Sequence, residues 1–248
     1  MSTFISLSAP MLDERDSLPE FVESVRDADN KVEVISSPAA WSPEDFAEEQ
    51  LQNLVRQLFL PGWPKASRQV LFCPVDAETR MSSLCTRIAR TLVAHSGSSA
   101  CVADAAQERN VSAGYSDEFP SESQQKHFGS LRSLCRQVSG GLWFMPRDVF
   151  LNGSSERLSP VSVRARLAEI RLEFDYTIIR GPAAAGSGDI GLLGGLCEGA
   201  VLVLQAGRTR RAAALHVKQR LQAANVRLLG TLLCERTFPV PQAIYQRF

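Results

Sequence analysis

Short apolar runs alternate along the chain with segments of helical, amphipathic periodicity. Six strands are predicted from the apolar runs at 69–75, 98–106, 141–146, 175–182, 199–207 and 227–235. Helices are predicted over 43–60, 82–95, 125–138, 160–173 and 209–226, with a short one after the loop 183–191. Buried strands separated by helices are typical of a parallel sheet covered on both faces. The pattern therefore predicts an α/β fold with a mainly parallel, twisted sheet.

The segment 69–93 has the outline of a phosphate-binding loop but lacks most of its chemical groups. It reads as a strand, a loop and a helix, and the spacing GxxxxGK[ST] can be laid over residues 75–82. Val75 and Arg80 then fall at the two glycine positions, and Met81 falls at the lysine position. Glycines let backbone N–H groups turn toward phosphate oxygens, and the lysine neutralises phosphate charge. We expect that this segment no longer binds nucleotide in that way.

The polar residues around this loop support the same interpretation. Asp76 and Glu78 place negative charge where phosphates would lie. Ser82 retains the hydroxyl of the motif, and Ser83 follows it. Because serine is favoured at helix N-termini, we expect the pair to cap a helix over 84–95.

Composition and charge bound the domain organisation. Of 27 acids and 27 bases, residues 1–50 hold 12 acids and 3 bases. We therefore expect an acidic, partly disordered extension over 1–42 and one α/β domain over 43–248. No apolar run approaches the ~20 residues that span a bilayer, and the chain starts without the pattern of a signal peptide. The prediction is a cytoplasmic protein whose 6 cysteines are free thiols.

Three stretches carry a resemblance to a known family: 69–93, FDYTIIRGP at 174–182, and the C-terminal run 199–248. They resemble the MinD/ParA-like (SIMIBI-type) branch of the P-loop NTPases. More narrowly, they resemble the bacterial tyrosine kinases and chain-length ATPases of capsular and exopolysaccharide synthesis. The resemblance implies the P-loop NTPase-like α/β fold for residues 43–248.

The departures from that family lie at positions that hold Mg²⁺ and phosphate. The family's signature lysine is replaced by Asp76, and its second-strand Asp-x-Asp motif keeps only Asp104. Arg180 stands where the family has the Walker B aspartate, and a cation cannot ligate Mg²⁺. The resemblance thus implies a degenerate nucleotide cleft, formed by Asp76, Glu78, Arg80, Met81, Ser82, Ser83, Asp104 and Arg180.

Arg180 leads to the most specific structural prediction, an ion pair with an acidic residue. At the end of a core strand it should point into the cleft, where Asp76, Glu78 and Asp104 are candidate partners. A buried guanidinium without a partner would cost several kcal/mol. We therefore expect an internal ion pair in place of the charge balance between Mg²⁺ and phosphate. Solvation of Arg180 at the mouth of the cleft is the alternative.

The function expected from these observations is non-catalytic. The chain is interpreted as a pseudo-ATPase or pseudo-tyrosine kinase with no catalytic residues, no cofactor and no metal. It would serve exopolysaccharide or capsule synthesis as a partner of a membrane chain-length or export protein, or of a homologous active ATPase. Such a partner would also bring it to the periphery of the inner membrane. A homodimer across the cleft, held by charges among Asp76, Glu78, Arg80 and Arg180, is also open.

Two alternatives belong to other classes. The first is an active tyrosine autokinase that binds ATP and Mg²⁺, with Arg80 or Arg180 as the phosphate cation. The second is a ParA-like positioning factor that contacts DNA through Arg208, Arg210 and Arg211. A solvated helix face explains these arginines more simply, so nucleic acid is disfavoured.

Overall fold

A computed structural model of the 248-residue chain describes residues 43–60, 66–77, 79–106, 130–153 and 158–235. Its strands are β1 (Gln69–Pro74), β2 (Ala100–Asp104), β3 (Arg136–Ser139), β4 (Leu142–Met145), β5 (Tyr176–Arg180), β6 (Gly199–Gln205) and β7 (Leu228–Cys234). The helices are α1 (Pro43–Phe59), α2 (Met81–Ser96), α3 (Arg147–Phe150), α4 (Pro160–Glu173), α5 (Asp189–Leu196) and α6 (Arg211–Ala223), with a 3₁₀ turn η1 (Leu131–Leu134).

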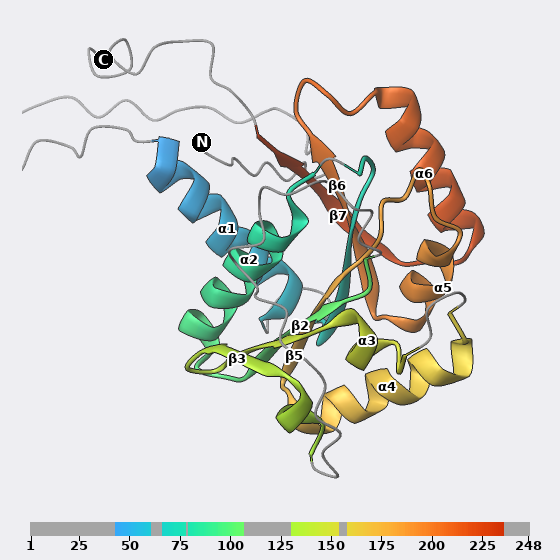
Figure 1. Cartoon of the computed structure of the whole chain (residues 1–248). Helices are drawn as coiled ribbons and strands as arrows, with labels where there is room; N and C mark the ends of the chain where they lie inside the picture. Colours follow the sequence, from blue (N-terminus) through green and yellow to red (C-terminus); the bar gives the residue numbers. More distant parts are fainter. Residues whose placement is uncertain (1–42, 61–65, 78, 107–129, 154–157, 236–248) are drawn as a thin grey trace, which may run out of the picture.

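The strands form one seven-stranded sheet in the order β3-β4-β2-β5-β1-β6-β7. Every neighbouring pair is parallel except β3 and β4, which are antiparallel. Strands β1 and β2 are buried along their whole length, as expected for strands covered on both faces. The predicted α/β fold with a mainly parallel sheet is confirmed (Figure 1).

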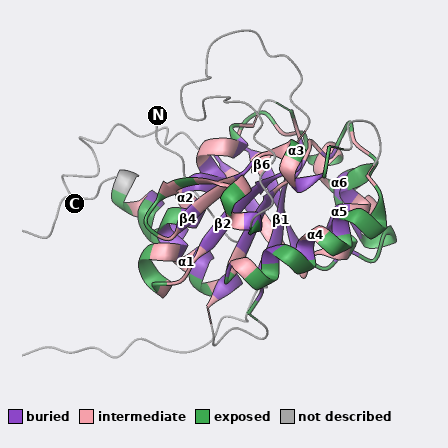
Figure 2. Cartoon of the chain, turned by 60° about the horizontal axis from the view of Figure 1, so that its bottom comes forward, coloured by how far each residue is buried: buried purple, intermediate pink, exposed green. Residues whose placement is uncertain are grey.

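Helices cover both faces of the sheet and bury a separate apolar cluster on each. On one face, Leu54 of α1 and Ile88 of α2 pack against strand residues such as Phe72. On the other face, Leu167 of α4 and Val217 of α6 take the same role. Figure 2 shows the buried residues concentrated in the sheet and the exposed ones on the outer sides of the helices.

The sequence pattern was wrong about the segment before the third predicted strand. A helix was expected over 125–138, but η1 occupies 131–134 and is followed by the strand β3. The reason is the hairpin at Gly140 and Gly141, which folds β3 back on β4. Gly141 has a φ of 81°, a conformation that side chains disfavour. Pairing with a neighbouring strand therefore overrode the helical periodicity.

The remaining predicted elements are present, with ends that differ by a few residues. The expected helix over 160–173 coincides with α4, whereas the short helix α3 was not expected. The acidic extension 1–42 and the end of the C-terminal run lie outside the described residues. Within the described part of the chain, no helix is both long and apolar enough to cross a membrane.

Candidate functional site

Three central strands end at the same edge of the sheet and bring the predicted site residues together. The loop that carries Asp76 follows β1, Asp104 is the last residue of β2, and Arg180 is the last residue of β5. Because β2 and β5 are parallel neighbours, Asp104 and Arg180 lie side by side in the sheet. This is the edge at which parallel α/β sheets bind their ligands.

Arg180 forms the predicted ion pair, and its partner is Asp104. Its Nε donates to Asp104 Oδ1 at 2.8 Å, and its Nη2 donates to Oδ2 at 2.6 Å. The two side chains are 15% and 8% exposed, so the pair is largely shielded from water. This two-bond geometry is the strongest that arginine forms with a carboxylate. The alternative of a solvated Arg180 is excluded.

The remaining nitrogen of the guanidinium reaches the helix that follows β1. Arg180 Nη1 donates a hydrogen bond to the Ser82 hydroxyl in the first turn of α2. Asp104 Oδ1, which accepts from Arg180 Nε, also accepts a hydrogen bond from the Ala106 backbone N–H at 2.9 Å. The guanidinium therefore connects the ends of β2 and β5 to the start of α2.

Asp76 is engaged elsewhere and does not pair with Arg180. Its Oδ2 accepts a hydrogen bond from the Thr209 hydroxyl at 2.6 Å. Thr209 in turn accepts the backbone N–H of Gln205 at 2.8 Å. These contacts tie the loop after β1 to the loop between β6 and α6. Thr209 was not among the expected site residues, although it opens the Thr-Arg-Arg run of the C-terminal resemblance.

The expectation that Ser82 and Ser83 cap α2 was wrong. The helix begins at Met81, so both serines lie within its first turn, and Arg80 occupies the N-cap position without a side-chain cap. Ser82 accepts the bond from Arg180, and the Ser83 hydroxyl donates to the Arg80 carbonyl at 3.3 Å. The helix starts early because Met81 is buried in the core, with 5% of its surface exposed.

The other predicted residues of the loop after β1 differ in their exposure to solvent. Val75 is fully buried, whereas Arg80 is exposed at the start of α2. Glu78 lies outside the described residues. Arg180 and Asp76 each have a partner within the chain, Asp104 for Arg180 and Thr209 for Asp76.

The chemistry of these side chains does not fit the Mg²⁺–nucleotide group that the resemblance implies. A guanidinium lies between a hydroxyl and a carboxylate, where a Mg²⁺ site would need oxygen ligands around a cation. The position that needs a phosphate-neutralising lysine holds a buried thioether, Met81. Among the described residues, no group of three or more His, Cys, Asp or Glu is arranged to hold a metal.

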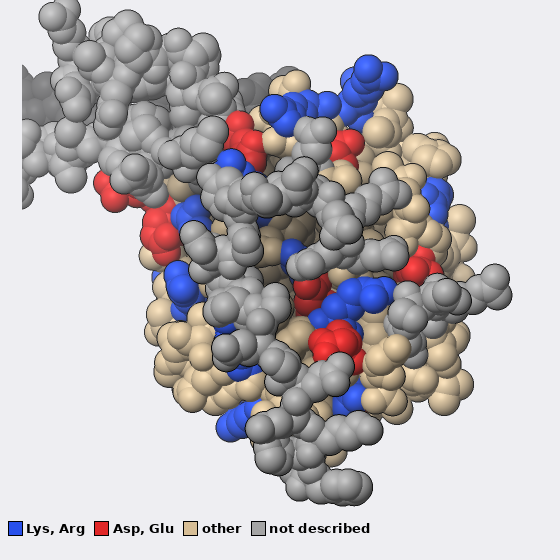
Figure 3. All heavy atoms as spheres, in the orientation of Figure 1, with Lys and Arg blue, Asp and Glu red and all other residues tan. Residues whose placement is uncertain are grey.

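The basic residues considered for DNA contact lie at one end of the molecule. Arg208, Arg210 and Arg211 are all exposed, in or next to the loop that leads into α6. Figure 3 shows basic side chains at the edge where α6 begins, with acidic ones close by.

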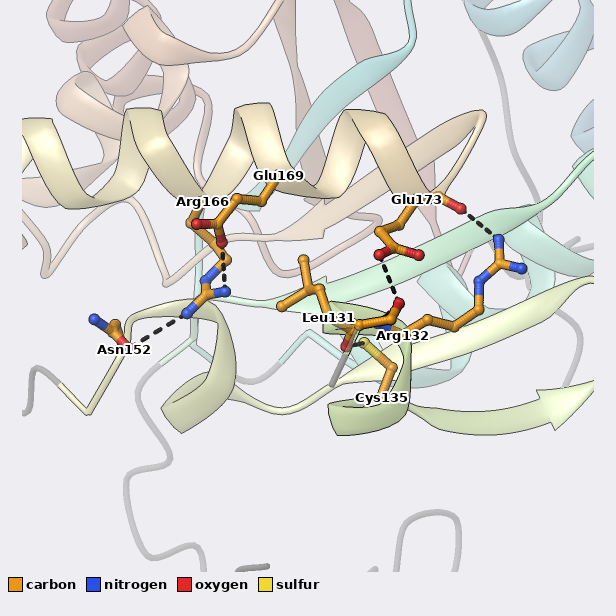
Figure 4. A network of polar contacts seen from close by, with 8 residues as sticks. Leu131, Arg132, Cys135, Asn152, Arg166, Glu169 and Glu173 are labelled. Carbon is orange, nitrogen blue, oxygen red and sulfur yellow. Dashed lines mark hydrogen bonds and ion pairs between the residues drawn. The ribbon is translucent and has the colours of Figure 1, made fainter. Parts of the chain in front are cut away.

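A second polar network, not foreseen from the sequence, joins η1 to the end of α4 (Figure 4). Arg132 donates to the Glu173 carbonyl, and its guanidinium stacks 4.4 Å from the ring centroid of Trp143.

Nearby, a hydrogen bond from the thiol of buried Cys101 lowers the pKa of the Cys135 thiol. Burial in turn raises the pKa of Cys101. All 6 cysteines are free thiols, as expected.

Comparison with known proteins supports the fold and not a closer identity. No protein-family model matches the chain, and no curated protein sequence matches it. The VpsO kinase domain is similar in structure with a TM-score of 0.60 and 16% identity, covering 78% of this chain and 98% of that one. The BceF tyrosine kinase domain gives 0.55 and 19% identity, covering 77% of both chains.

The kinase domain of the Escherichia coli tyrosine kinase ETK gives a TM-score of 0.54 and 17% identity, covering 79% of this chain and 80% of that one. The chain has the P-loop α/β fold of the bacterial tyrosine kinase domains.

Proposed function

We propose that the chain is a pseudo-ATPase or pseudo-tyrosine kinase that acts as a non-catalytic partner in exopolysaccharide or capsule synthesis or export. One observation carries this proposal: the Arg180 guanidinium lies between Asp104 and Ser82. In the family that the sequence resembles, the positions of Arg180 and Ser82 belong to residues that hold Mg²⁺. An internal cation of fixed position would there replace the metal and balance the charge without a nucleotide.

The loop after β1 supports the same conclusion. Val75 and Met81 are buried and their apolar side chains carry no group that binds phosphate, while their backbone N–H groups donate to the Val203 and Thr79 carbonyls. Asp76 is held by Thr209, which keeps a negative charge close to the place that a phosphate would take. Repulsion between this carboxylate and a triphosphate adds to the missing attraction.

The proposed partner is a membrane chain-length or export protein, or a homologous active ATPase. The proposal rests on the similarity to tyrosine kinase domains such as VpsO and BceF. Binding to such a partner would place the chain at the cytoplasmic side of the inner membrane. Co-purification in detergent with a membrane chain-length protein of the same organism tests this part; a chain that never co-purifies would contradict it.

The nucleotide part of the proposal is tested by calorimetric titration of the full chain with ATP and ADP, each with Mg²⁺. We expect no heat of binding up to millimolar nucleotide. Micromolar, Mg²⁺-dependent binding would instead mean that the site is rebuilt around arginine, and it would favour the active kinase over our proposal.

Two variants separate these outcomes further. If the chain is an enzyme, Arg80→Ala and Arg180→Ala should lose ATP turnover. If our proposal is right, both variants should match the wild type, with no turnover above background. Circular dichroism of each variant would show that the fold is retained, since Arg180→Ala also removes the partner of Asp104.

A further inference from the structure

Helix α4 has two apolar faces, of which one packs against the core formed by the described residues. Val163, Leu167 and Ile170 point into the core and are buried. On the opposite side, Val161 is 78% exposed and Leu172 is 89% exposed. These are the two most exposed large apolar side chains among the described residues. Figure 2 shows exposed residues along the outer side of this helix.

The outward apolar residues form a continuous stripe. Ala165 and Ala168 are also exposed and lie between the two ends, so the four residues follow one another at intervals of four, three and four. This is the spacing of positions a and d in a heptad repeat, which puts all four on one side of a helix. The two alanines in the middle would let another helix approach closely. We call Val161, Ala165, Ala168 and Leu172 the α4 stripe.

The charges beside the stripe differ in sign between its two flanks. Arg164 and Arg171 lie on one flank, at heptad position g, and Ser162 and Glu169 lie on the other, at position e. Arg171 is paired with Glu198 of its own chain. Glu169 is held by Arg166 at 2.7 Å and remains 54% exposed (Figure 4). Within the described part of the chain, Arg164 has no acidic side chain within 4.0 Å.

The charges on the two flanks of α4 are complementary to those of a second copy of the helix in one relative orientation. In a parallel helix pair, position g of one helix faces position e of the next heptad on the other helix. Arg164 would then face Glu169 of the second copy, and the two-fold symmetry would repeat that contact. An antiparallel pair would bring the arginine flanks of both copies together. The charges therefore favour a parallel pair of identical helices.

We propose that the α4 stripe is a self-association surface on which a second copy of this chain docks, with the two α4 helices parallel. The helix has 14 residues and is about 21 Å long, so it buries less than the ~1,600 Å² of a standard interface. The dimer is therefore reversible and forms in the micromolar range. The stripe shares no residue with the candidate site at the ends of β1, β2 and β5.

Sedimentation of the full chain from low micromolar to several hundred micromolar concentration tests the proposal. The wild type should pass from monomer to dimer. Leu172→Glu and Val161→Glu should each weaken self-association by roughly tenfold or more, because each places a charge in the apolar seam. Leu215→Glu is the matched control: Leu215 is 47% exposed on α6, outside the stripe, and its variant should associate like the wild type.

Charge exchange and crosslinking test the orientation. Arg164→Glu and Glu169→Arg should each weaken the dimer, and the double variant should restore it, which an antiparallel pair would not show. Val161→Cys should form an intermolecular disulfide under mild oxidation, because each residue of a parallel pair lies opposite its own copy. In an antiparallel pair the two positions would be about 16 Å apart along the axis. The wild type, with its native thiols, is the control.

Other occupants of the stripe give different results. A chain that stays monomeric at every concentration, or a dimer that Leu172→Glu leaves unchanged, would overturn the proposal. A monomer that Leu172→Glu destabilises would show that another part of the same chain covers the stripe. A dimer across the nucleotide cleft would respond to changes at Arg80 and not to changes in α4.

Discussion

At the level of single residues, the central feature is the guanidinium of Arg180, a cation that the chain itself supplies to the site. Arg180 and Asp104 end neighbouring parallel strands, and Ser82 lies in the first turn of the adjacent helix. Because the pair is largely shielded from water, removal of one member leaves a charge that the protein must hold unpaired. The stability of the fold around the site therefore depends on both side chains of the pair.

We expect Asp104→Ala to lower the free energy of unfolding by about 3 kcal/mol, because it leaves the guanidinium of Arg180 without its carboxylate. Urea denaturation followed by circular dichroism measures this change. The matched control is Arg171→Ala, which breaks an ion pair with Glu198 whose arginine is 44% exposed. That variant should cost less than about 1 kcal/mol. Equal losses in the two variants would contradict the importance of shielding.

At the scale of elements, contacts between helices and strands decide what each position tolerates. Helix α5 contains two adjacent glycines in different surroundings. A Cβ on Gly194 would lie 2.7 Å from Val226 Cγ1, whereas a Cβ on Gly195 would meet only the Ala224 carbonyl at 4.0 Å. The first glycine allows α5 to approach the segment before β7, and the second has no such role.

The two glycines therefore give opposite predictions. Gly194→Ala should destabilise the protein by about 1–3 kcal/mol, because the added methyl overpacks against Val226. Gly195→Ala should stabilise it by up to about 1 kcal/mol, because alanine favours the helix at a position with free space. Chemical denaturation of both variants checks the signs. A stabilised Gly194→Ala would mean that Val226 moves aside without cost.

The starts of β2 and β5 are joined by a pH-dependent contact. Asp175 Oδ2 accepts hydrogen bonds from the Ser99 backbone N–H at 2.9 Å and from the Ser99 hydroxyl at 2.8 Å. These bonds lower the pKa of Asp175 from its ordinary value of 3.8, the backbone bond having the larger effect. The charged form is thus the one that the fold favours. The stabilisation is fully present above pH 3.8 and is lost as the pH falls through the folded-state pKa.

Asp175→Asn should therefore lower stability at neutral pH by about 0.5–1 kcal/mol, a modest value because the side chain is exposed. The difference from the wild type should shrink as the pH falls below 3.8. Denaturation curves at a series of pH values measure it. Ser99→Ala, which keeps the backbone bond, should show a smaller difference with the same pH dependence. A difference that grows at low pH would contradict this explanation.

At the level of the whole molecule, polar contacts within the chain connect the sheet to the elements around the candidate site. The ends of β1, β2 and β5 are connected to α2 and to the loop before α6 by the contacts of Arg180 and Asp76. In a nucleotide-dependent protein of this fold, bound Mg²⁺ and phosphates would supply such connections. Internal contacts that replace them would leave stability independent of nucleotide.

We accordingly expect that millimolar Mg²⁺–ATP leaves the thermal midpoint of unfolding unchanged. A ligand present at 100 times its dissociation constant would stabilise the folded state by about 2.7 kcal/mol, enough to raise the midpoint by several degrees. Differential scanning calorimetry detects such a change. A rise with ATP and Mg²⁺, but not with Mg²⁺ alone, would contradict the proposed loss of nucleotide binding.

The sequence alone determined the class of fold and the chemistry missing from the loop after β1. Apolar runs and helical periods are local patterns, so they predicted α4 and β1 well. The absence of glycine and lysine at Val75, Arg80 and Met81 can be seen without coordinates. The sequence also predicted that Arg180 needs an acidic partner, because a shielded guanidinium is costly without one.

The contacts between residues far apart in the sequence became clear from the folded chain and not from the sequence pattern. Arg180 and Asp104 are 76 residues apart and meet because β2 and β5 are neighbours in register. The same limit explains the error over 125–138, where pairing of β3 with β4 overrode the local period. It also explains α4, whose two apolar faces look equivalent in the sequence until packing on the sheet buries one and leaves Val161 and Leu172 exposed.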